Sequence, residues 1–388
     1  MKAGIGHYTA GLLRSLAAHA GGQVESFPAG WIRRAVDLYS RARPALDTHQ
    51  PGAEASGPPR PWRRWRGRLL QAAHQAAFQA VGWQFRAQCR RRRYDLYHEP
   101  NTIPLPVDLP TLSTIHDLSL LLHPEWHTLE RVGHFEKHLR RALDQCRHFL
   151  TDTDFIRDEA IRVLGIAPER ITRVYIGIRD DLRPLPAAQV QAVLRKLELP
   201  EQYLLYVGTI EPRKNLLMLL QVYCTLPASV RERWPFVLVG KWGWNAREVA
   251  DYLQHTARHQ GVRHLGYLAD EHVAALYNGA RALVYPSHYE GFGLPPLEMM
   301  SCGGAVLAST AGSVAEIAST RAHLIDPHDA DSWRAALLRI TSDNDWWHSL
   351  RQGVVEHARS FSWDRCARET FAVYQAILGQ VPALRRAG

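Results

Sequence analysis

The chain has 388 residues, of which 46% are hydrophobic and 22% are charged, a composition typical of folded globular proteins. This length predicts two or three domains. No apolar run approaches the ~18 residues of a transmembrane helix, and glycines interrupt the N-terminus where a signal peptide needs an apolar core. Five widely spaced cysteines exclude a dense disulfide framework and a cysteine-built zinc site. We therefore expect a cytoplasmic protein.

The net charge of +9 is concentrated in one segment. Ten arginines and no acidic residue lie between Arg60 and Arg93, and without them basic and acidic residues almost balance. Trp62, Trp65 and Trp83 are interleaved with these arginines. Three interpretations remain open: a solvated helical face, contact with an anionic membrane surface, or nucleic-acid binding, for which no recognised motif accompanies the patch. Of these we favour the membrane.

The N-terminus begins with glycines where a strand is expected. Gly4 and Gly6 come directly before a helical pattern, and a glycine-rich turn that opens a helix normally follows a strand. Only three residues precede Gly4. We therefore expect that the first strand of the first sheet is missing and that the native start lies upstream of Met1.

Short β-rich runs alternate with amphipathic helical stretches along the rest of the chain. This alternation predicts βαβ units and doubly wound parallel sheets. The predicted strands are Thr111–His116, Tyr203–Val207, Phe236–Val239, Ala282–Tyr285 and Ala305–Ala308, and the predicted helices are Glu130–Cys146, Asn215–Thr225, Ala246–His259 and Glu271–Asn278. Prolines at 184 and 186 indicate a boundary, so we expect domains at 1–183 and 184–360, followed by a helical segment at 361–388.

A D-x-D sequence follows the strand-like stretch near residue 150. Asp152 and Asp154 could hold a metal–nucleotide complex, as a D-x-D pattern does in some enzymes. Because Asp154 comes directly before a helical pattern, we instead expect it to cap that helix. We expect no catalytic metal.

The stretch YVGTIEPRKN, residues 206–215, runs from a predicted strand into a predicted helix. Arg213 and Lys214 therefore lie at the carboxyl end of a strand beside a helix N-terminus, an arrangement that suits a pyrophosphate. A solvated charged loop is the alternative interpretation of these residues taken alone.

The stretch EGFGLPPLE, residues 290–298, is the most informative in the chain. Its glycines allow the backbone to approach a ligand closely, and its prolines suit the first turn of a helix. We expect Glu290 on the loop and Glu298 within that first turn, where both carboxylates can accept hydrogen bonds from sugar hydroxyls. An acidic pair that only neutralises a helix N-terminus is the alternative.

Together these stretches resemble the retaining glycosyltransferases of family 4. Other matching segments are GIGHYT at the N-terminus, TIHDLS at 114–119, ITRVYIGI at 171–178, LVGKWGWN at 238–245, LGYLADEHVAALY at 265–277 and FSWDRCARET near the end. The resemblance covers nearly the whole chain. It implies the α/β fold called GT-B, in which two Rossmann-like domains face a central cleft. The N-terminal domain would bind the acceptor, the C-terminal domain the nucleotide-sugar, and the C-terminal helix would return to the N-terminal domain.

The resemblance also implies roles for individual residues. Glu298 would bind the ribose hydroxyls and Glu290 the donor sugar. Arg213 and Lys214 would neutralise the diphosphate leaving group, whose charge grows in the transition state. The remaining donor contacts would come from the backbone of Gly291, Phe292, Gly293 and Leu294 and from Gly4 and Gly6.

His116 matches a family histidine that faces the acceptor and the donor sugar. A lone histidine is more often structural, but the resemblance favours a catalytic role for His116 beside Glu290 and Lys214. Two positions depart from the pattern of many relatives: Thr209 stands where an arginine is common, and Ile176 where a polar residue is common. Diphosphate binding would then depend more on Arg213 and Lys214.

The sequence thus predicts a metal-independent, retaining hexosyltransferase that needs no cofactor. We expect it to move a mannose- or rhamnose-type sugar from a nucleotide-sugar to a growing cell-surface glycan such as an O-antigen. A lipid-linked acceptor would place the enzyme peripherally at the inner membrane face, and no nucleic acid is expected as a partner. Retention requires either same-face displacement, which we favour, or double displacement through a nucleophile. A nucleotide-sugar epimerase of the same fold and a non-enzymatic anion-binding protein are the alternatives.

Overall fold

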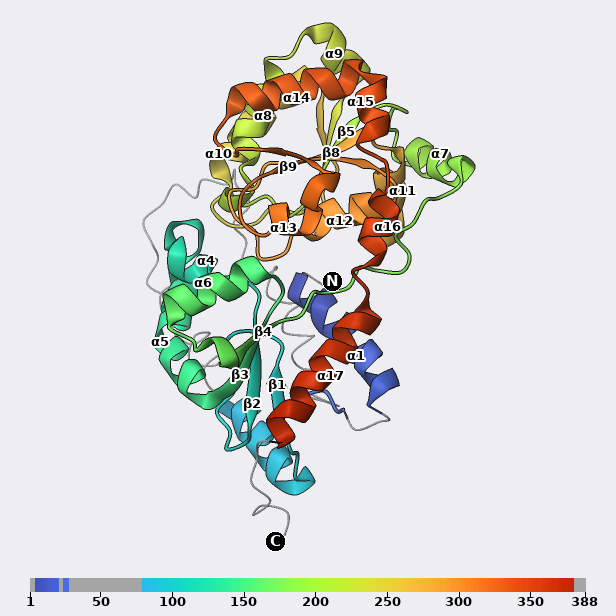
Figure 1. The fold of residues 1–388 in the computed structure, drawn as a ribbon. Helices are drawn as coiled ribbons and strands as arrows, with labels where there is room; N and C mark the ends of the chain where they lie inside the picture. The colour runs from blue at the N-terminus through green and yellow to red at the C-terminus, as the bar shows by residue number, and fades with distance from the viewer. Residues whose placement is uncertain (1–3, 21–23, 28–78, 380–388) are drawn as a thin grey trace, which may run out of the picture.

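The computed structural model describes residues 4–20, 24–27 and 79–379, and its described strands form two parallel sheets (Figure 1). The N-terminal sheet has four strands in the order β1-β2-β3-β4, namely Tyr97–Glu99, Thr111–Ile115, Cys146–Thr151 and Ile171–Arg173. The C-terminal sheet has six strands in the order β10-β9-β8-β5-β6-β7. These are His323–Ile325, Ala305–Ser309, Ala282–Tyr285, Leu204–Val207, Phe236–Val239 and Val262–His264. This is the expected GT-B arrangement of two α/β domains.

Helices connect the successive parallel strands in both domains, except that β1 and β2 are joined by residues 100–110, which form no helix. In the N-terminal domain they are α1 (Gly4–His19), a helix over residues 79–92, α4 (Ser119–Leu122), η1 (Pro124–Trp126), α5 (Leu129–Gln145), α6 (Asp154–Leu164) and η2 (Pro168–Arg170). In the C-terminal domain they begin with α7 (Ala187–Lys196), η3 (Pro212–Lys214), α8 (Leu216–Cys224), α9 (Ala228–Arg233), α10 (Arg247–His255) and η4 (Ala257–Gln260). They continue with α11 (Asp270–Gly279), α12 (Leu294–Ser301), α13 (Val314–Ala318), η5 (Ser319–Arg321), α14 (Ala330–Ser342), α15 (Asn344–Ser349) and α16 (Val354–Arg359).

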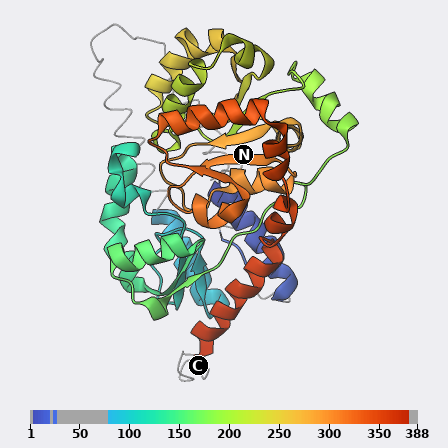
Figure 2. The same ribbon diagram turned by 45° about the horizontal axis from the view of Figure 1, so that its top comes forward.

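The last helix, α17 (Trp363–Gly379), returns to the N-terminal domain and lies beside α1 (Figures 1 and 2). Its first residue, Trp363, packs so tightly against Gly11 and Gly177 that a Cβ atom on either glycine would collide with it. At the surface, His19 and Asp364 are joined by a 2.8 Å bond. Helix α17 therefore packs against α1 and is joined to it by this contact.

The long buried strands agree closely with the sequence prediction. Strands β6 and β8 have the predicted bounds, and β2, β5 and β9 differ by one residue. Their residues are all or nearly all buried, because helices cover both faces of a parallel sheet. The sequence analysis missed the three-residue strands β1, β4, β7 and β10, which carry too few residues to show a pattern.

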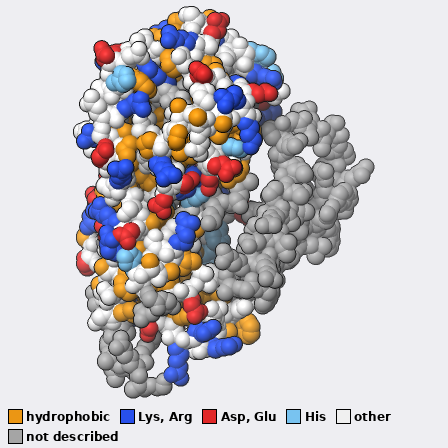
Figure 3. Space-filling model, turned by 90° about the vertical axis from the view of Figure 1, so that its right-hand side faces the viewer, with side chains coloured by type: hydrophobic (Ala, Val, Ile, Leu, Met, Phe, Trp, Pro, Cys, Tyr) orange, Lys and Arg blue, Asp and Glu red, His pale blue; other side chains and the backbone are white. Residues whose placement is uncertain are grey.

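The predicted glycine-rich turn at the N-terminus is wrong. Gly4 and Gly6 lie inside the first turn of α1, where glycine is tolerated because the amide groups of that turn have no partner within the helix. Of the described helices, none is long and apolar enough to cross a membrane. On the face shown in Figure 3, basic and acidic side chains are mixed over the described surface.

Candidate functional site

Glu290 lies between the carboxyl end of β8 and the start of α12, and it is only 4% exposed. Its Oε1 accepts hydrogen bonds from Lys214 Nζ at 2.5 Å and from Tyr285 Oη at 2.7 Å. Its Oε2 accepts from Arg213 Nη1 at 2.8 Å. Both carboxylate oxygens are therefore fully engaged by neighbouring side chains.

The charge of Glu290 is fixed by these neighbours. Burial alone would raise the pKa of its carboxyl group, but the charges of Lys214 and Arg213 lower that pKa to about 2. Burial and the adjacent Arg213 lower the pKa of Lys214, while the carboxylates of Glu290 and Glu211 raise the pKa of Arg213 against the effect of burial. Glu290 is consequently an anion at any physiological pH.

The sequence prediction brought Arg213 and Lys214 together with Glu290 only through the family resemblance. In the structure both cations lie on η3, a single 3₁₀ turn between β5 and α8. Arg213 also donates from Nε to Glu211 Oε1 at 2.6 Å. The two cations thus face two carboxylates, and Glu211 is a site residue that the sequence analysis missed although it directly precedes Pro212.

The glycine-rich loop touches the other domain. A Cβ atom on Gly291 would collide with the backbone carbonyl of His116, so only glycine fits there. Gly293 has φ +93°, in the left-handed region, and forms the N-cap of α12, whose first residue is Leu294. Phe292 is buried, with its ring 6.0 Å from that of Phe361. Gly291, Phe292 and Gly293 therefore end the connection between β8 and α12, and Leu294 begins the helix.

Glu298 is not in the first turn of α12 as predicted. The helix begins at Leu294, before both prolines, so Glu298 falls in the second turn. Its Oε2 accepts a 2.7 Å hydrogen bond from Tyr277 Oη on α11. Burial raises the pKa of Glu298, although the hydrogen bond from Tyr277 and the charge of Arg179 oppose this rise.

His116 follows β2 and uses both of its ring nitrogens. Nδ1 lies 2.6 Å from Asp152 Oδ2, and Nε2 lies 2.9 Å from the backbone oxygen of Pro100. Since both neighbouring atoms are acceptors, the ring satisfies both contacts only when both nitrogens carry protons. Burial would lower the pKa of His116, but Asp152 and the Pro100 carbonyl raise it overall. These contacts favour the protonated, positively charged form of His116, although burial also raises the pKa of Asp152.

The two carboxylates of the D-x-D sequence have separate partners. Asp152 is 3% exposed and holds His116, whereas Asp154 lies 3.4 Å from Arg173. The predicted helix cap at Asp154 is wrong by one residue: Thr153 is the N-cap of α6, because its backbone is extended and its hydroxyl accepts from Ile156 N. The sequence analysis missed the role of Asp152, since nothing in a linear pattern pairs residues 116 and 152.

Helix α1 contacts His116 through Tyr8. The Tyr8 ring meets that of His116 edge to face at 4.7 Å, and its hydroxyl lies 3.0 Å from Thr114 Oγ1. Tyr8 is 4% exposed. Gly4 and Gly6 precede it by one turn or less, so the N-terminal turn of α1 lies near His116.

Comparisons with known proteins agree with this geometry. A family model described as "Glycosyltransferase Family 4" matches residues 3–182, and one described as "Glycosyl transferases group 1" matches residues 193–361. The chain is 38% identical over 284 residues to the O-antigen chain mannosyltransferase B of Escherichia coli, covering 73% of this chain and 74% of that protein. This chain belongs to glycosyltransferase family 4.

Solved structures share the fold of this glycosyltransferase at low sequence identity. Sucrose-phosphate synthase from Thermosynechococcus elongatus superposes with a TM-score of 0.65 at 22% identity, covering 79% of each chain. WaaG, a glycosyltransferase involved in lipopolysaccharide biosynthesis, superposes with a TM-score of 0.63 at 16% identity, covering 77% of this chain and 82% of WaaG. The likeness extends over both domains.

The two domains of the glycosyltransferase are joined by polar contacts around the site. Thr153 Oγ1 donates to Gly291 O at 3.1 Å and lies 2.8 Å from Ser313 Oγ. Glu316 of the C-terminal domain accepts from the backbone amides of Asp154 and Phe155 at 2.9 and 2.8 Å. These contacts join the Glu290 loop and α13 to the start of α6.

Most of the basic segment 60–93 of the glycosyltransferase lies outside the described residues. Its described part is the helix over residues 79–92, on which Trp83 is 68% exposed. Arg90 and Arg91 are exposed on the same helix, and both line a hollow with Trp83 and Arg86. An exposed tryptophan thus accompanies exposed arginines on this helix.

Proposed function

We propose that this glycosyltransferase transfers mannose from a nucleotide-sugar to a growing O-antigen-type glycan with retention of configuration. The identity of 38% with an O-antigen chain mannosyltransferase, over about three quarters of both chains, supports the sugar and the class of acceptor. A rhamnose-type donor is the alternative from the sequence analysis, and no relative described above favours it.

The observation that carries the proposal is the contact between the two loops. The Glu290 loop of the C-terminal domain lies against the backbone of His116 in the N-terminal domain. A donor sugar beside Glu290 and an acceptor beside His116 would meet at this boundary. Holding two reactants in register is itself a large part of catalysis, because it removes the entropic cost of their encounter.

The side chains suggest how the donor is held. Glu298 would accept hydrogen bonds from the two ribose hydroxyls, and the backbone from Gly291 to Leu294 would follow the sugar and phosphates. Arg213 and Lys214 would stabilise the departing diphosphate. Both cations already contact Glu290, so the diphosphate would share them with the carboxylate of Glu290. Gly4 and Gly6 would approach the diphosphate from the N-terminal domain.

The contacts of Glu290 support same-face displacement. A nucleophile needs a free oxygen aimed at the sugar, but both oxygens of Glu290 accept hydrogen bonds from cations. In the same-face route the acceptor hydroxyl attacks as the sugar–phosphate bond breaks, and its proton passes to the departing phosphate. His116, as an imidazolium, would be a fixed positive charge beside this step and would not act as the base.

A transfer assay tests the proposal directly. The enzyme is incubated with GDP-mannose and a mannose-terminated oligosaccharide, and the product is analysed by mass spectrometry and by NMR of the new anomeric centre. We expect a product one hexose longer with the α configuration of the donor. An inverted product, or transfer from other nucleotide-sugars only, would contradict the proposal, and conversion of the donor without acceptor would indicate the epimerase.

We further propose that the acceptor is lipid-linked and that the enzyme docks peripherally on the cytoplasmic face of the membrane. Each basic residue near an anionic surface contributes about 1 kcal/mol, and Trp83 would add an apolar contact that salt does not screen. We expect wild-type protein to float with anionic vesicles at low salt, and the Arg90→Glu, Arg91→Glu variant to float less. If wild type stays in the soluble fraction, the acceptor is a soluble glycan.

A further inference from the structure

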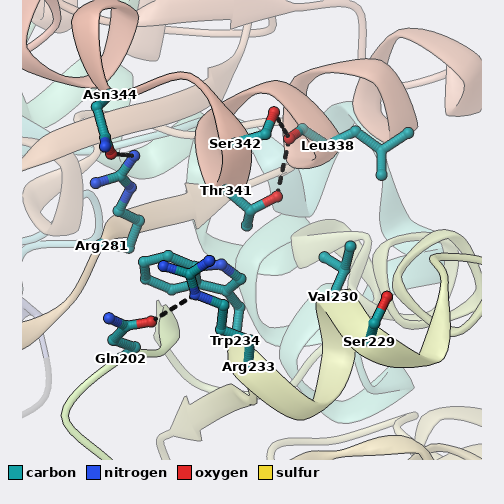
Figure 4. Close-up of a pocket in the computed structure, with 10 residues that line it drawn as sticks. All are labelled: Gln202, Ser229, Val230, Arg233, Trp234, Arg281, Leu338, Thr341, Ser342 and Asn344. Atoms are coloured by element: carbon teal, nitrogen blue, oxygen red, sulfur yellow. Dashed lines mark hydrogen bonds between the residues drawn. The ribbon is translucent and has the colours of Figure 1, made fainter.

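A polar cavity lies in the C-terminal domain, at the end of the sheet opposite to Glu290. It has a volume of about 720 Å³ (Figure 4). Gln202, Trp234 and Arg281 each lie one or two residues before the strands β5, β6 and β8, so the cavity opens at the amino ends of three adjacent strands. The end of α14 and the helix α9 complete it. Glu290, by contrast, follows the carboxyl end of β8.

Arg281 forms the base of this cavity and is only 8% exposed. Its Nε donates to Ile340 O at 2.7 Å and its Nη2 to Asn344 Oδ1 at 2.8 Å, so both acceptors are neutral. Among the described residues no carboxylate lies within 4.0 Å of it, and the nearby Asp343 pairs with Arg339. Burial and the positive charges of Arg233 and Arg351 lower the pKa of Arg281, and the charge of Asp343 opposes them. Arg281 also lies 4.3 Å from the centre of the Trp347 ring. A buried cation with no carboxylate in contact is unusual, because buried charges are normally paired.

Arg233 brings a second guanidinium group to the same wall. Its carbon Cζ lies 5.6 Å from the centre of the Trp234 ring, while that of Arg281 lies 5.2 Å from the same ring. Arg233 donates only to a neutral partner, Gln202 Oε1 at 3.1 Å. The described wall therefore carries two cations around one indole and no carboxylate.

The mouth of the cavity is polar, uncharged and exposed. Amide groups of Gln202 and Asn344 and hydroxyl groups of Ser229 and Ser342 line it (Figure 4). Such groups hydrogen-bond to the hydroxyls of a small molecule, whereas guanidinium groups bind phosphate through paired N–H donors. The volume falls within the range of pockets that hold small ligands.

We propose that this cavity binds a small phosphorylated metabolite of the size of a hexose phosphate, with its phosphoryl group at Arg281 and Arg233. The hydroxyl-bearing body of the ligand lies against the amides and serines of the mouth. This site is separate from the donor site and does not depend on the proposed transfer reaction.

The decisive variant is Asn344→Asp, which places a carboxylate where the amide oxygen already accepts from Arg281. Asn344 is the first residue of α15, a position where aspartate suits the helix dipole, so the variant should fold. The new carboxylate would pair with Arg281 and so occupy the cation that the phosphoryl group is proposed to bind. We expect it to bind hexose phosphate at least tenfold more weakly than wild type while its transfer activity is unchanged.

Binding is measured by thermal shift and by calorimetry with inorganic phosphate and with glucose 6-phosphate as probes. At roughly tenfold excess over Kd we expect wild type to gain about 1–3 °C in Tm. Arg233→Gln should lose most of this gain, and the exposed control Arg334→Gln on α14 should keep it. A larger effect of glucose 6-phosphate than of inorganic phosphate would show that the mouth binds the sugar.

The donor site also attracts phosphate, so Lys214→Ala serves as the second control. If the probes bind in the distal cavity, Lys214→Ala retains the shift in Tm and Asn344→Asp loses it. The opposite pattern would place the phosphate at the donor site and overturn the proposal. No shift in wild-type protein up to millimolar probe would overturn it as well.

Discussion

The two domains hold their charged site residues in different ways. On the C-terminal side, Glu290 contacts two cations and Arg213 contacts two carboxylates, so the two central charges of the cluster each have two partners. On the N-terminal side, the ring of His116 contacts one carboxylate, that of Asp152, and one neutral carbonyl, while the charge of Asp117 acts on it without a contact between the two side chains. The C-terminal cluster should therefore survive the loss of one cation, whereas His116 has one charged contact to lose.

The largest effect is expected from Lys214→Ala. Arg213 still neutralises Glu290, so the domain should fold, but the diphosphate loses a cation when its charge is greatest. We expect kcat to fall by roughly 10²–10³-fold, the cost of removing one transition-state donor, with a smaller change in KM. Steady-state kinetics measure both, with the exposed Lys137→Ala on α5 as control. A change in KM alone would show that Lys214 binds the substrate and the transition state equally well.

Asp152→Asn should have the next largest effect, because His116 then loses its only hydrogen-bonded carboxylate among the described residues. A hydrogen bond between charged groups is worth about 1.5–3 kcal/mol. Since the folded protein raises the pKa of His116, this stabilisation is present below pH 6.5 and is lost as pH rises through the raised pKa. The loss of Tm in the variant should thus be greatest just below pH 6.5 and shrink toward alkaline pH, and it should shrink again in acid, where Asp152, whose pKa is also raised, becomes protonated.

The pH dependence of turnover gives a second measurement on the same variant. If the imidazolium assists the transfer, the alkaline limb of the kcat profile moves to lower pH in Asp152→Asn. An identical pH profile for kcat, together with a loss of Tm that is constant from pH 5 to 9, would contradict the ion pair and reduce Asp152 to a packing residue.

Glu298→Ala tests donor binding on the C-terminal side. It removes the acceptor for two ribose hydroxyls, and we expect affinity for the nucleotide-sugar to weaken by about 1–3 kcal/mol in calorimetry. Tyr277→Phe removes only the hydroxyl that holds Glu298 in the free protein and should weaken binding less. Unchanged affinity in Glu298→Ala would show that the ribose lies elsewhere.

Excess EDTA should have no effect on activity. The expected charge stabilisation comes from Arg213, Lys214 and His116, and the two D-x-D carboxylates contact His116 and Arg173. Activity that falls with EDTA and returns with Mg²⁺ or Mn²⁺ would contradict metal independence and would require Asp152 to leave His116.

The C-terminal half of the site was largely readable from the sequence because its residues are contiguous. Glu290 to Glu298 and Arg213 to Lys214 each follow a predicted strand, so a linear pattern places each stretch at the carboxyl end of a strand. Their proximity to each other came only from the family resemblance. The finer positions were less predictable: the second-turn location of Glu298 depends on Gly293 adopting a left-handed conformation.

The N-terminal half could not be read in this way. His116, Asp152 and Tyr8 come from separate elements, and only the three-dimensional packing of β2, β3 and α1 brings them together. The short strand β1, which directly precedes Pro100, is equally invisible in the sequence. Long-range pairs of this kind leave no periodic signal, and the family resemblance identified only one member of the set.

The carboxylate of Glu316 also bears on how firmly the two domains are joined. It accepts hydrogen bonds from two backbone amides at the start of α6 and from Tyr175 Oη at 2.9 Å, and the helix dipole favours a negative charge there. Separating the domains breaks the contacts with these amides and leaves the start of α6 without an acceptor until water replaces the carboxylate. These bonds therefore oppose separation of the two domains beside the site.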